Sequence, residues 1–149
     1  MIPSEQKRIL LIEDDGAIAK AVEETLKEKG NCIIEKAYSY ISAVGKWKQA
    51  KKKGEEFDYI ILDLNISVVG MSNELLNEYY PFIGMAFLHK ICENDEDLRN
   101  RLIKKLFVYT GYEAPLKIRA LEKGWKIDDM QFISKRPDSI QTLINKVFA

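Results

Sequence analysis

Four short, largely apolar segments are spread over the whole chain, and polar residues follow each of them. The segments are residues 9–12, 59–62, 106–109 and 132–134, and the residues that close them are Glu13-Asp14-Asp15, Asp63, Thr110 and Lys135. Unbroken apolar segments of this length, rich in β-branched and aromatic residues, are typical of strands buried on both faces of a parallel sheet. Helical patterns alternate with them, which favours βαβ units with helices on both sides. The sequence therefore predicts an α/β fold.

The polar residues that close these segments are expected to share one edge of the sheet. In an open parallel sheet, ligands bind beyond the carboxyl ends of the strands. Two carboxylates about 4 Å apart repel by roughly 4 kcal/mol at an effective dielectric of about 20. A cluster of Glu13, Asp14 and Asp63 would therefore either hold a proton or recruit a cation. Oxygen ligands favour Mg²⁺, and the lack of His or Cys at these positions disfavours zinc.

The order of these residues resembles that of the receiver domains of two-component response regulators, such as the chemotaxis receivers. Four stretches carry the resemblance, in order and over nearly the whole chain: residues 9–15, 58–64, 107–111 and 132–135. It implies a doubly wound, five-stranded parallel sheet of the flavodoxin-like order 2-1-3-4-5. Residues 1–149 would form a single receiver domain, and the pattern leaves no room for an output domain.

The resemblance also implies roles for individual residues. Asp63 would accept a phosphoryl group, Thr110 would donate a hydrogen bond to it, and Lys135 would offset its charge. Mg²⁺ would be the cofactor. Its ligands would be Glu13 (through water), Asp14, Asp63 and the main-chain carbonyl of Asn65.

A conformational switch and a control of phosphoryl lifetime follow from the same resemblance. Thr110 and Phe132 would move together, because a phosphoryl group bound in only one arrangement favours that arrangement. Asn65 and Tyr112 lie two residues beyond Asp63 and Thr110, at positions that tune phosphoryl lifetime in receivers. The bulky Tyr112 would shield the group from water.

The function implied is that of a stand-alone response regulator, not an enzyme acting on an external substrate. It would accept a phosphoryl group from a sensor histidine kinase or a phosphotransfer protein and signal by contact with a downstream protein. The alternative is a phosphorylation-independent interaction module, because Arg136 separates Lys135 from Pro137 where the family places Pro directly after Lys. A hydrolase with an aspartate nucleophile is a third class. Such enzymes usually carry a second Asp two residues on, where this chain has Asn65.

Composition limits the partners. Lys+Arg and Asp+Glu total 23 each, so no global field attracts nucleic acid, and no direct nucleic-acid partner is expected. No apolar stretch has membrane-spanning length, and no signal-peptide core is present. Cys32 and Cys92 are isolated and suit small buried residues in a reducing compartment. We expect a cytoplasmic protein without a membrane partner, and a homodimer is compatible with the sequence.

Two segments are longer than the receiver pattern requires. Residues 67–83, after the third strand, exceed the usual connection by about a dozen residues. Within this insertion, residues 72–80 would form two helical turns that Pro81 stops. The insertion is either a lid or partner surface, or an elaboration that packs on the domain and does nothing else, and the second is slightly favoured. Residues 93–105 would extend the preceding helix and add a solvated turn.

Helices are expected between the strands. Asp15 would cap the first helix or face solvent. Residues 39–52 would form a second helix, with Ile41, Val44 and Trp47 facing inward. A final amphipathic helix would carry apolar residues from 140 to 147.

Overall fold

The computed structural model describes residues 6–93, 95–110, 131–134 and 139–148. At its centre lies a parallel five-stranded sheet of order β2-β1-β3-β4-β5, which is the predicted order. The strands are β1 (Lys7–Ile12), β2 (Cys32–Ala37), β3 (Tyr59–Leu62), β4 (Leu106–Thr110) and β5 (Gln131–Ser134).

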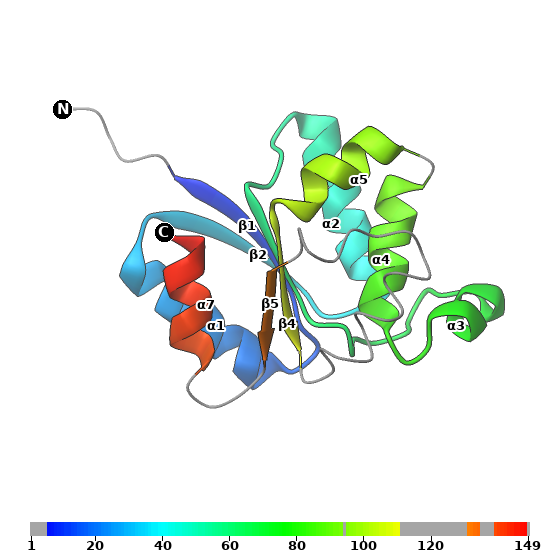
Figure 1. Cartoon of the computed structure of the whole chain (residues 1–149), viewed down its shortest axis with the longest axis horizontal. Helices are drawn as coiled ribbons and strands as arrows, with labels where there is room; N and C mark the ends of the chain where they lie inside the picture. The colour runs from blue at the N-terminus through cyan, green and yellow to red at the C-terminus, as the bar shows by residue number, and fades with distance from the viewer. Residues whose placement is uncertain (1–5, 94, 111–130, 135–138, 149) are drawn as a thin grey trace.

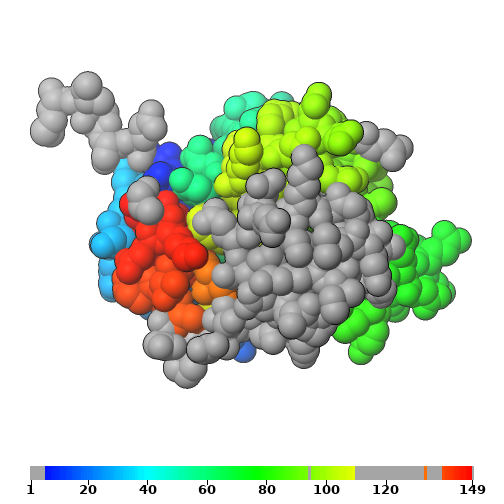
Figure 2. Space-filling model, in the orientation of Figure 1, coloured from blue at the N-terminus to red at the C-terminus, as the bar shows by residue number. Residues whose placement is uncertain are grey.

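Helices cover both faces of the sheet (Figure 1). One face carries α1 (Gly16–Lys29) and α7 (Ser139–Val147). The other face carries α2 (Tyr40–Lys53), α4 (Ile83–Cys92) and α5 (Glu96–Ile103). The short helix α3 (Asn73–Tyr79) lies beside α4 and projects at one side of the molecule (Figure 2). The predicted doubly wound α/β fold is confirmed. Within the described ranges, no helix combines the length and apolarity needed to cross a membrane.

The central strands bury alternate side chains in two separate cores. In β1, Leu10 and Ile12 pack in the core that contains residues of α2 and α4, whereas Ile9 and Leu11 pack with residues of α1 and α7. The same alternation continues in the neighbouring strands, with Ile60, Leu62, Leu106 and Val108 in the first core and Ile61 and Phe107 in the second. Every one of these side chains is at most 1% exposed. Burial on both faces explains why the strand segments are apolar without alternation.

The predicted cap of the first helix is confirmed. Asp15 Oδ1 accepts hydrogen bonds from the amides of Ala17 and Ile18, at 3.0 and 3.2 Å. The side chain therefore satisfies two amides of the first turn, which have no partner inside the helix. The final helix is also confirmed as α7, with Leu143, Ile144 and Val147 buried.

The prediction that Ile41 faces inward is wrong, because this side chain is 53% exposed. The inward face of α2 starts at Tyr40 and continues with Ala43, Val44 and Ala50, all of them buried. This spacing is that of one helical stripe, and Ile41 lies one position away from it.

The prediction that residues 93–105 extend the preceding helix, α4, is wrong. Glu93 has a φ of 44°, which ends the helix. Asp95 Oδ1 then accepts a hydrogen bond from the amide of Leu98 at 2.9 Å and caps a separate helix, α5. This helix is not merely solvated, because Leu102 and Ile103 are buried.

The insertion packs on the domain over its second half. The predicted helical turns are confirmed as α3, which Ser72 caps through a 3.2 Å hydrogen bond from Leu75 N. Tyr79 is 1% exposed, and its ring lies 5.6 Å from that of His89 on α4. This half therefore packs against α4 through Tyr79, whereas the neighbouring Tyr80 is 65% exposed and Val69 in the first half is 61% exposed.

Both cysteines lie in apolar surroundings, as expected. Cys92 is buried, and burial raises the pKa of its thiol to about 11. Cys32 is half-buried, and partial burial raises the pKa of this thiol as well. The thiols therefore stay protonated at neutral pH and act as small packing groups.

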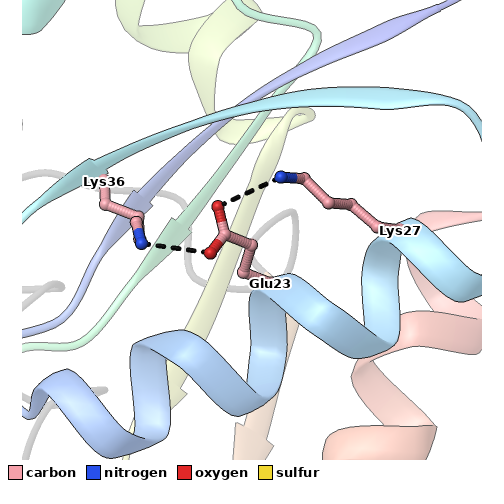
Figure 3. A network of polar contacts seen from close by, with 3 residues as sticks. All are labelled: Glu23, Lys27 and Lys36. Atoms are coloured by element: carbon pink, nitrogen blue, oxygen red, sulfur yellow. Dashed lines mark hydrogen bonds and ion pairs between the residues drawn. The ribbon is translucent and has the colours of Figure 1, made fainter.

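A charge network connects α1 to the edge strand β2 (Figure 3). Glu23 accepts a hydrogen bond from Lys36 Nζ at 3.0 Å and forms an ion pair with Lys27 Nζ at 3.4 Å. The bond with Lys36 lowers the pKa of Glu23 below its ordinary value of 4.5, against the opposing effect of burial. The same bond raises the pKa of Lys36.

We expect Glu23→Gln to lower the free energy of unfolding at pH 7 by less than about 1 kcal/mol, since the pairs are partly exposed and screened. Because folding lowers the pKa of Glu23, its contribution is complete above pH 4.5 and is lost as the pH falls through the folded-state value. Urea unfolding at a series of pH values measures this difference. Glu24→Gln, at an exposed position on the same helix, is the matched control. An equal loss in both variants, or a loss independent of pH, would contradict the prediction.

Candidate functional site

Backbone hydrogen bonds hold two acidic residues just beyond the ends of β1 and β3. Glu13 N donates to the carbonyl of Ala37 at 3.0 Å, and Asp63 N donates to the carbonyl of Ile12 at 2.9 Å. Each bond continues a parallel ladder by one residue. Both side chains lie close to the core, with Glu13 2% exposed and Asp63 4% exposed.

Glu13, Asp14 and Asp63 form one acidic cluster at this edge. One carboxylate oxygen from each residue lies within 4.8 Å of the others, and Asp14 is exposed. Glu13 Oε1 accepts a hydrogen bond from Asp15 N at 3.2 Å, and Asp63 Oδ1 accepts one from Asn65 N at 3.2 Å. These local bonds orient the two buried carboxylates. The structure thus brings together the three acidic residues that the sequence indicated.

The donor set of the acidic cluster fits a hard divalent cation. Two unit charges within 4.8 Å of each other repel by at least roughly 3 kcal/mol at an effective dielectric of about 20. Mg²⁺ and Ca²⁺ bind oxygen atoms at about 2.0–2.6 Å, so oxygens on one such ion lie within about 5 Å of one another. All three side chains offer only carboxylate oxygens, which suits these ions better than Zn²⁺.

The other predicted site residues are described only in part. Thr110 is the last residue of β4, and its backbone is paired with Ser134 at the end of β5. Because β4 is the neighbour of β3, Thr110 lies at the same edge of the sheet as Asp63. Phe132 belongs to β5. The side chains of Thr110 and Phe132 lie outside the described part of the structure, as do Tyr112, Lys135 and Arg136.

Gly84 belongs to the surroundings of Asp63, although the sequence patterns did not indicate it. Its amide donates to the carbonyl of Leu64 at 2.9 Å. A Cβ at this position would lie 2.8 Å from the carbonyl oxygen of Asp63 and 3.0 Å from Leu64 Cα. The start of α4 therefore touches the main chain of the acidic residue, and only glycine leaves room for this contact. A glycine at the start of an apolar helix was the one available signal.

The sequence matches no protein-family model and no curated protein. The structure, however, is similar to solved receiver domains. A CheY-like receiver domain protein of Methanospirillum hungatei JF-1 matches with a TM-score of 0.62 and 23% identity, over 97% of this chain and 92% of that chain. The chain has the fold of a receiver domain.

Two further structures with the receiver fold show the range of the similarity. The chemotaxis protein CheY4 of Vibrio cholerae matches with a TM-score of 0.65 and 19% identity, over 97% of this chain and 98% of that chain. A response regulator of Burkholderia pseudomallei, solved with a phosphorylated aspartic acid, a calcium ion and citrate, matches with a TM-score of 0.59 and 20% identity. The coverage is 95% of this chain and 66% of that chain. The resemblance seen in the sequence is thus confirmed for the fold.

We expect Gly84→Ala to lower the free energy of unfolding by about 1–3 kcal/mol, because the new methyl group would force the backbone at Asp63 or α4 to shift. Gly45→Ala is the matched control. Gly45 lies in α2 with nothing within 4 Å of a Cβ, so this variant should gain about 0.5–1 kcal/mol. Urea unfolding of both variants measures the two effects. Wild-type stability in Gly84→Ala would contradict the close approach.

We also expect Mg²⁺ to stabilise the wild type against heat, by about 2.7 kcal/mol at one hundred times its dissociation constant. Asp63→Asn should lose this gain and should be more stable than the wild type without metal, because one repelling charge is gone. Thermal unfolding with and without Mg²⁺ tests both expectations. Asp97→Asn, an exposed residue of α5, should keep the metal dependence. A Mg²⁺ effect that is the same in both variants would place the metal elsewhere.

Proposed function

We propose that this chain is a response-regulator receiver that accepts a phosphoryl group on Asp63. The observation that carries this proposal is the acidic cluster at the carboxyl edge of a receiver-fold sheet, with Asp63 buried and oriented by the amide of Asn65. This edge is where open parallel sheets bind their ligands. We further propose that residues 1–149 form one receiver domain.

The donor would be a sensor histidine kinase or a phosphotransfer protein that carries a phosphohistidine. A carboxylate oxygen of Asp63 forms a bond to phosphorus while the bond between phosphorus and the imidazole nitrogen breaks. The bonding pair stays on that nitrogen, and because the other ring nitrogen of the phosphohistidine carries a proton, the imidazole leaves in its neutral form. Water later attacks the phosphorus of the acyl phosphate, the bond between phosphorus and the Asp63 oxygen breaks, and inorganic phosphate leaves while the carboxylate is restored. The protein therefore modifies and resets itself rather than turning over an external substrate. The B. pseudomallei relative supports this chemistry, since its structure contains a phosphorylated aspartic acid.

Mg²⁺ is the proposed cofactor. Asp14, Asp63 and the main-chain carbonyl of Asn65 would hold it directly, and Glu13 would hold it through a water molecule. When bound, the ion supplies positive charge beside the phosphoryl oxygens. Main-chain hydrogen bonds fix Glu13 and the acceptor Asp63. The amide of each residue donates to a neighbouring strand, and a carboxylate oxygen of each accepts a bond from the amide two residues further on.

The remaining predicted residues keep their proposed roles. Thr110 would donate a hydrogen bond to a phosphoryl oxygen, and Lys135 would offset its charge. Thr110 and Phe132 would change position together and so present a new surface to a downstream protein. Asn65 and Tyr112 would set the lifetime of the phosphoryl group.

The proposal predicts that wild-type protein, incubated with Mg²⁺ and acetyl phosphate, gains the mass of one phosphoryl group. Asp63→Asn should gain none, because an amide oxygen is a poor nucleophile towards phosphorus, whereas Asp97→Asn should react like the wild type. Intact-mass spectrometry gives the readout, with chelator in place of Mg²⁺ as the second control. A wild type that stays unmodified with acetyl phosphate and with phosphorylated histidine kinases would reject the proposal. That result would favour a phosphorylation-independent interaction module.

A further inference from the structure

Exposed apolar side chains are concentrated in one place. The structure shows six large hydrophobic side chains as exposed within its described ranges, and four of them lie on two neighbouring segments. These four are Tyr38 (43% exposed), Ile41 (53%), Val68 (41%) and Val69 (61%), and together we call them the rim patch. Neither residues 38–41 nor residues 67–70 include a charged residue.

Main-chain bonds join the two segments of the rim patch. Tyr40 N donates to the carbonyl of Ser67 at 3.0 Å, and Ile41 N donates to the carbonyl of Val69 at 3.2 Å. Ser39 and Ser67 form a parallel bridge. Below the surface, Tyr40 and Ile66 are 5% and 3% exposed and anchor the two segments in the core. The exposed side chains therefore stand on a fixed surface rather than on a loose loop.

The rim patch lies at the same edge of the sheet as the acidic cluster. Tyr38 directly follows Ala37, whose carbonyl accepts the amide of Glu13 at 3.0 Å. On the other segment, Val68 is joined to Asp63 by a short stretch in which Leu64 and Ile66 are buried. The acceptor carboxylate and the rim patch thus belong to one continuous edge of the molecule. Contiguous apolar surface is a feature of protein contact sites, whose centres are depleted of charge.

We propose that the rim patch is the docking surface for the protein that donates the phosphoryl group, a histidine-phosphorylated protein with an apolar face beside its histidine. This inference rests on the proposed function of Asp63. In a productive complex the phosphorus lies about 3–3.5 Å from the attacking oxygen. Asp63 is 4% exposed, and a histidine side chain is short, so the main chain of the donor must cover the edge around Asp63. A second copy or a downstream protein has no such requirement to cover this edge.

A small phosphodonor reaches Asp63 without covering the edge, and this separates docking from chemistry. Val69→Ser and Ile41→Ser each remove apolar surface from a different segment of the rim patch. Ile33→Ser is the matched control, because Ile33 is 37% exposed on β2 and is paired with Arg8, away from the carboxyl edge. The donors are acetyl phosphate and a set of purified histidine kinases, phosphorylated with ATP and then freed of nucleotide.

We expect the transfer rate from the kinases to fall about tenfold in Val69→Ser and Ile41→Ser, the effect of losing one good interface contact. The rate with acetyl phosphate should stay within about twofold of the wild type. Ile33→Ser should match the wild type with both donors. Circular dichroism and thermal unfolding check that all three variants fold.

Other outcomes would overturn the inference. Equal kinase transfer to all variants would show that the rim patch is not a donor surface. Equal slowing with both donors would show that the substitutions disturb the site itself. Modification by acetyl phosphate but by no kinase would reject a protein donor at this surface. A wild-type dimer that Val69→Ser dissociates in sedimentation would assign the rim patch to a second copy. Failure of both acetyl phosphate and the kinases to modify the wild type would instead reject the proposed function of Asp63.

Discussion

The amide of Asp63 is bonded to the carbonyl of Ile12, and the amide of Glu13 is bonded to that of Ala37. Through these two bonds the ladders between β2, β1 and β3 end at the same level. The strands cannot slide past one another to separate the charges. A register shift of one residue would move each apolar side chain from one core to the opposite face of the sheet. The sheet therefore forces carboxylates together at an energetic cost of a few kcal/mol, which a bound cation can offset. The metal and phosphoryl chemistry that we propose depends on this alignment.

The strands and the acidic edge could be predicted because both follow from local patterns, whereas the strand order was implied by the resemblance to receiver domains. Unbroken apolar segments mark strands buried on two faces, and the residues that follow parallel strands meet at one edge. Three features could not be predicted in this way. The outward position of Ile41 depends on where α2 begins, since one residue rotates a side chain by about 100°. The break between α4 and α5 depends on the positive φ of Glu93, which charge patterning does not reveal. The contact of Gly84 with Asp63 joins residues far apart in sequence and exists only in the folded chain.

The insertion leaves the receiver fold intact because it starts and ends at one point. The amide of Gly84 is bonded to the carbonyl of Leu64, so the bond closes the insertion at its base, beside Asp63. A longer loop destabilises the fold only slightly, since each doubling of its length raises the entropic cost of closing it by only about 0.6 kcal/mol. The burial of Tyr79 against α4 offsets that cost. The extra residues therefore add surface next to the acidic cluster without moving the strands that build it.

Some apolar side chains of the insertion are packed and others are exposed, and this difference bears on how a phosphodonor is recognised. Met71 and Tyr79 pack against the core, whereas Val68 and Val69 stay in water. At 41% and 61% exposure, each of these valines forgoes up to about 1 kcal/mol of further burial. A phosphorylated donor is anionic, and the three carboxylates at this edge repel it unless positive charge at the site offsets them. Apolar contacts are not weakened by this repulsion, because they do not depend on charge. The rim patch, an uncharged surface at this edge, can hold the donor in place while its phosphoryl group enters the negatively charged site. The apolar side chains that stay exposed in the free protein are buried when the donor binds, and this burial contributes to the binding free energy.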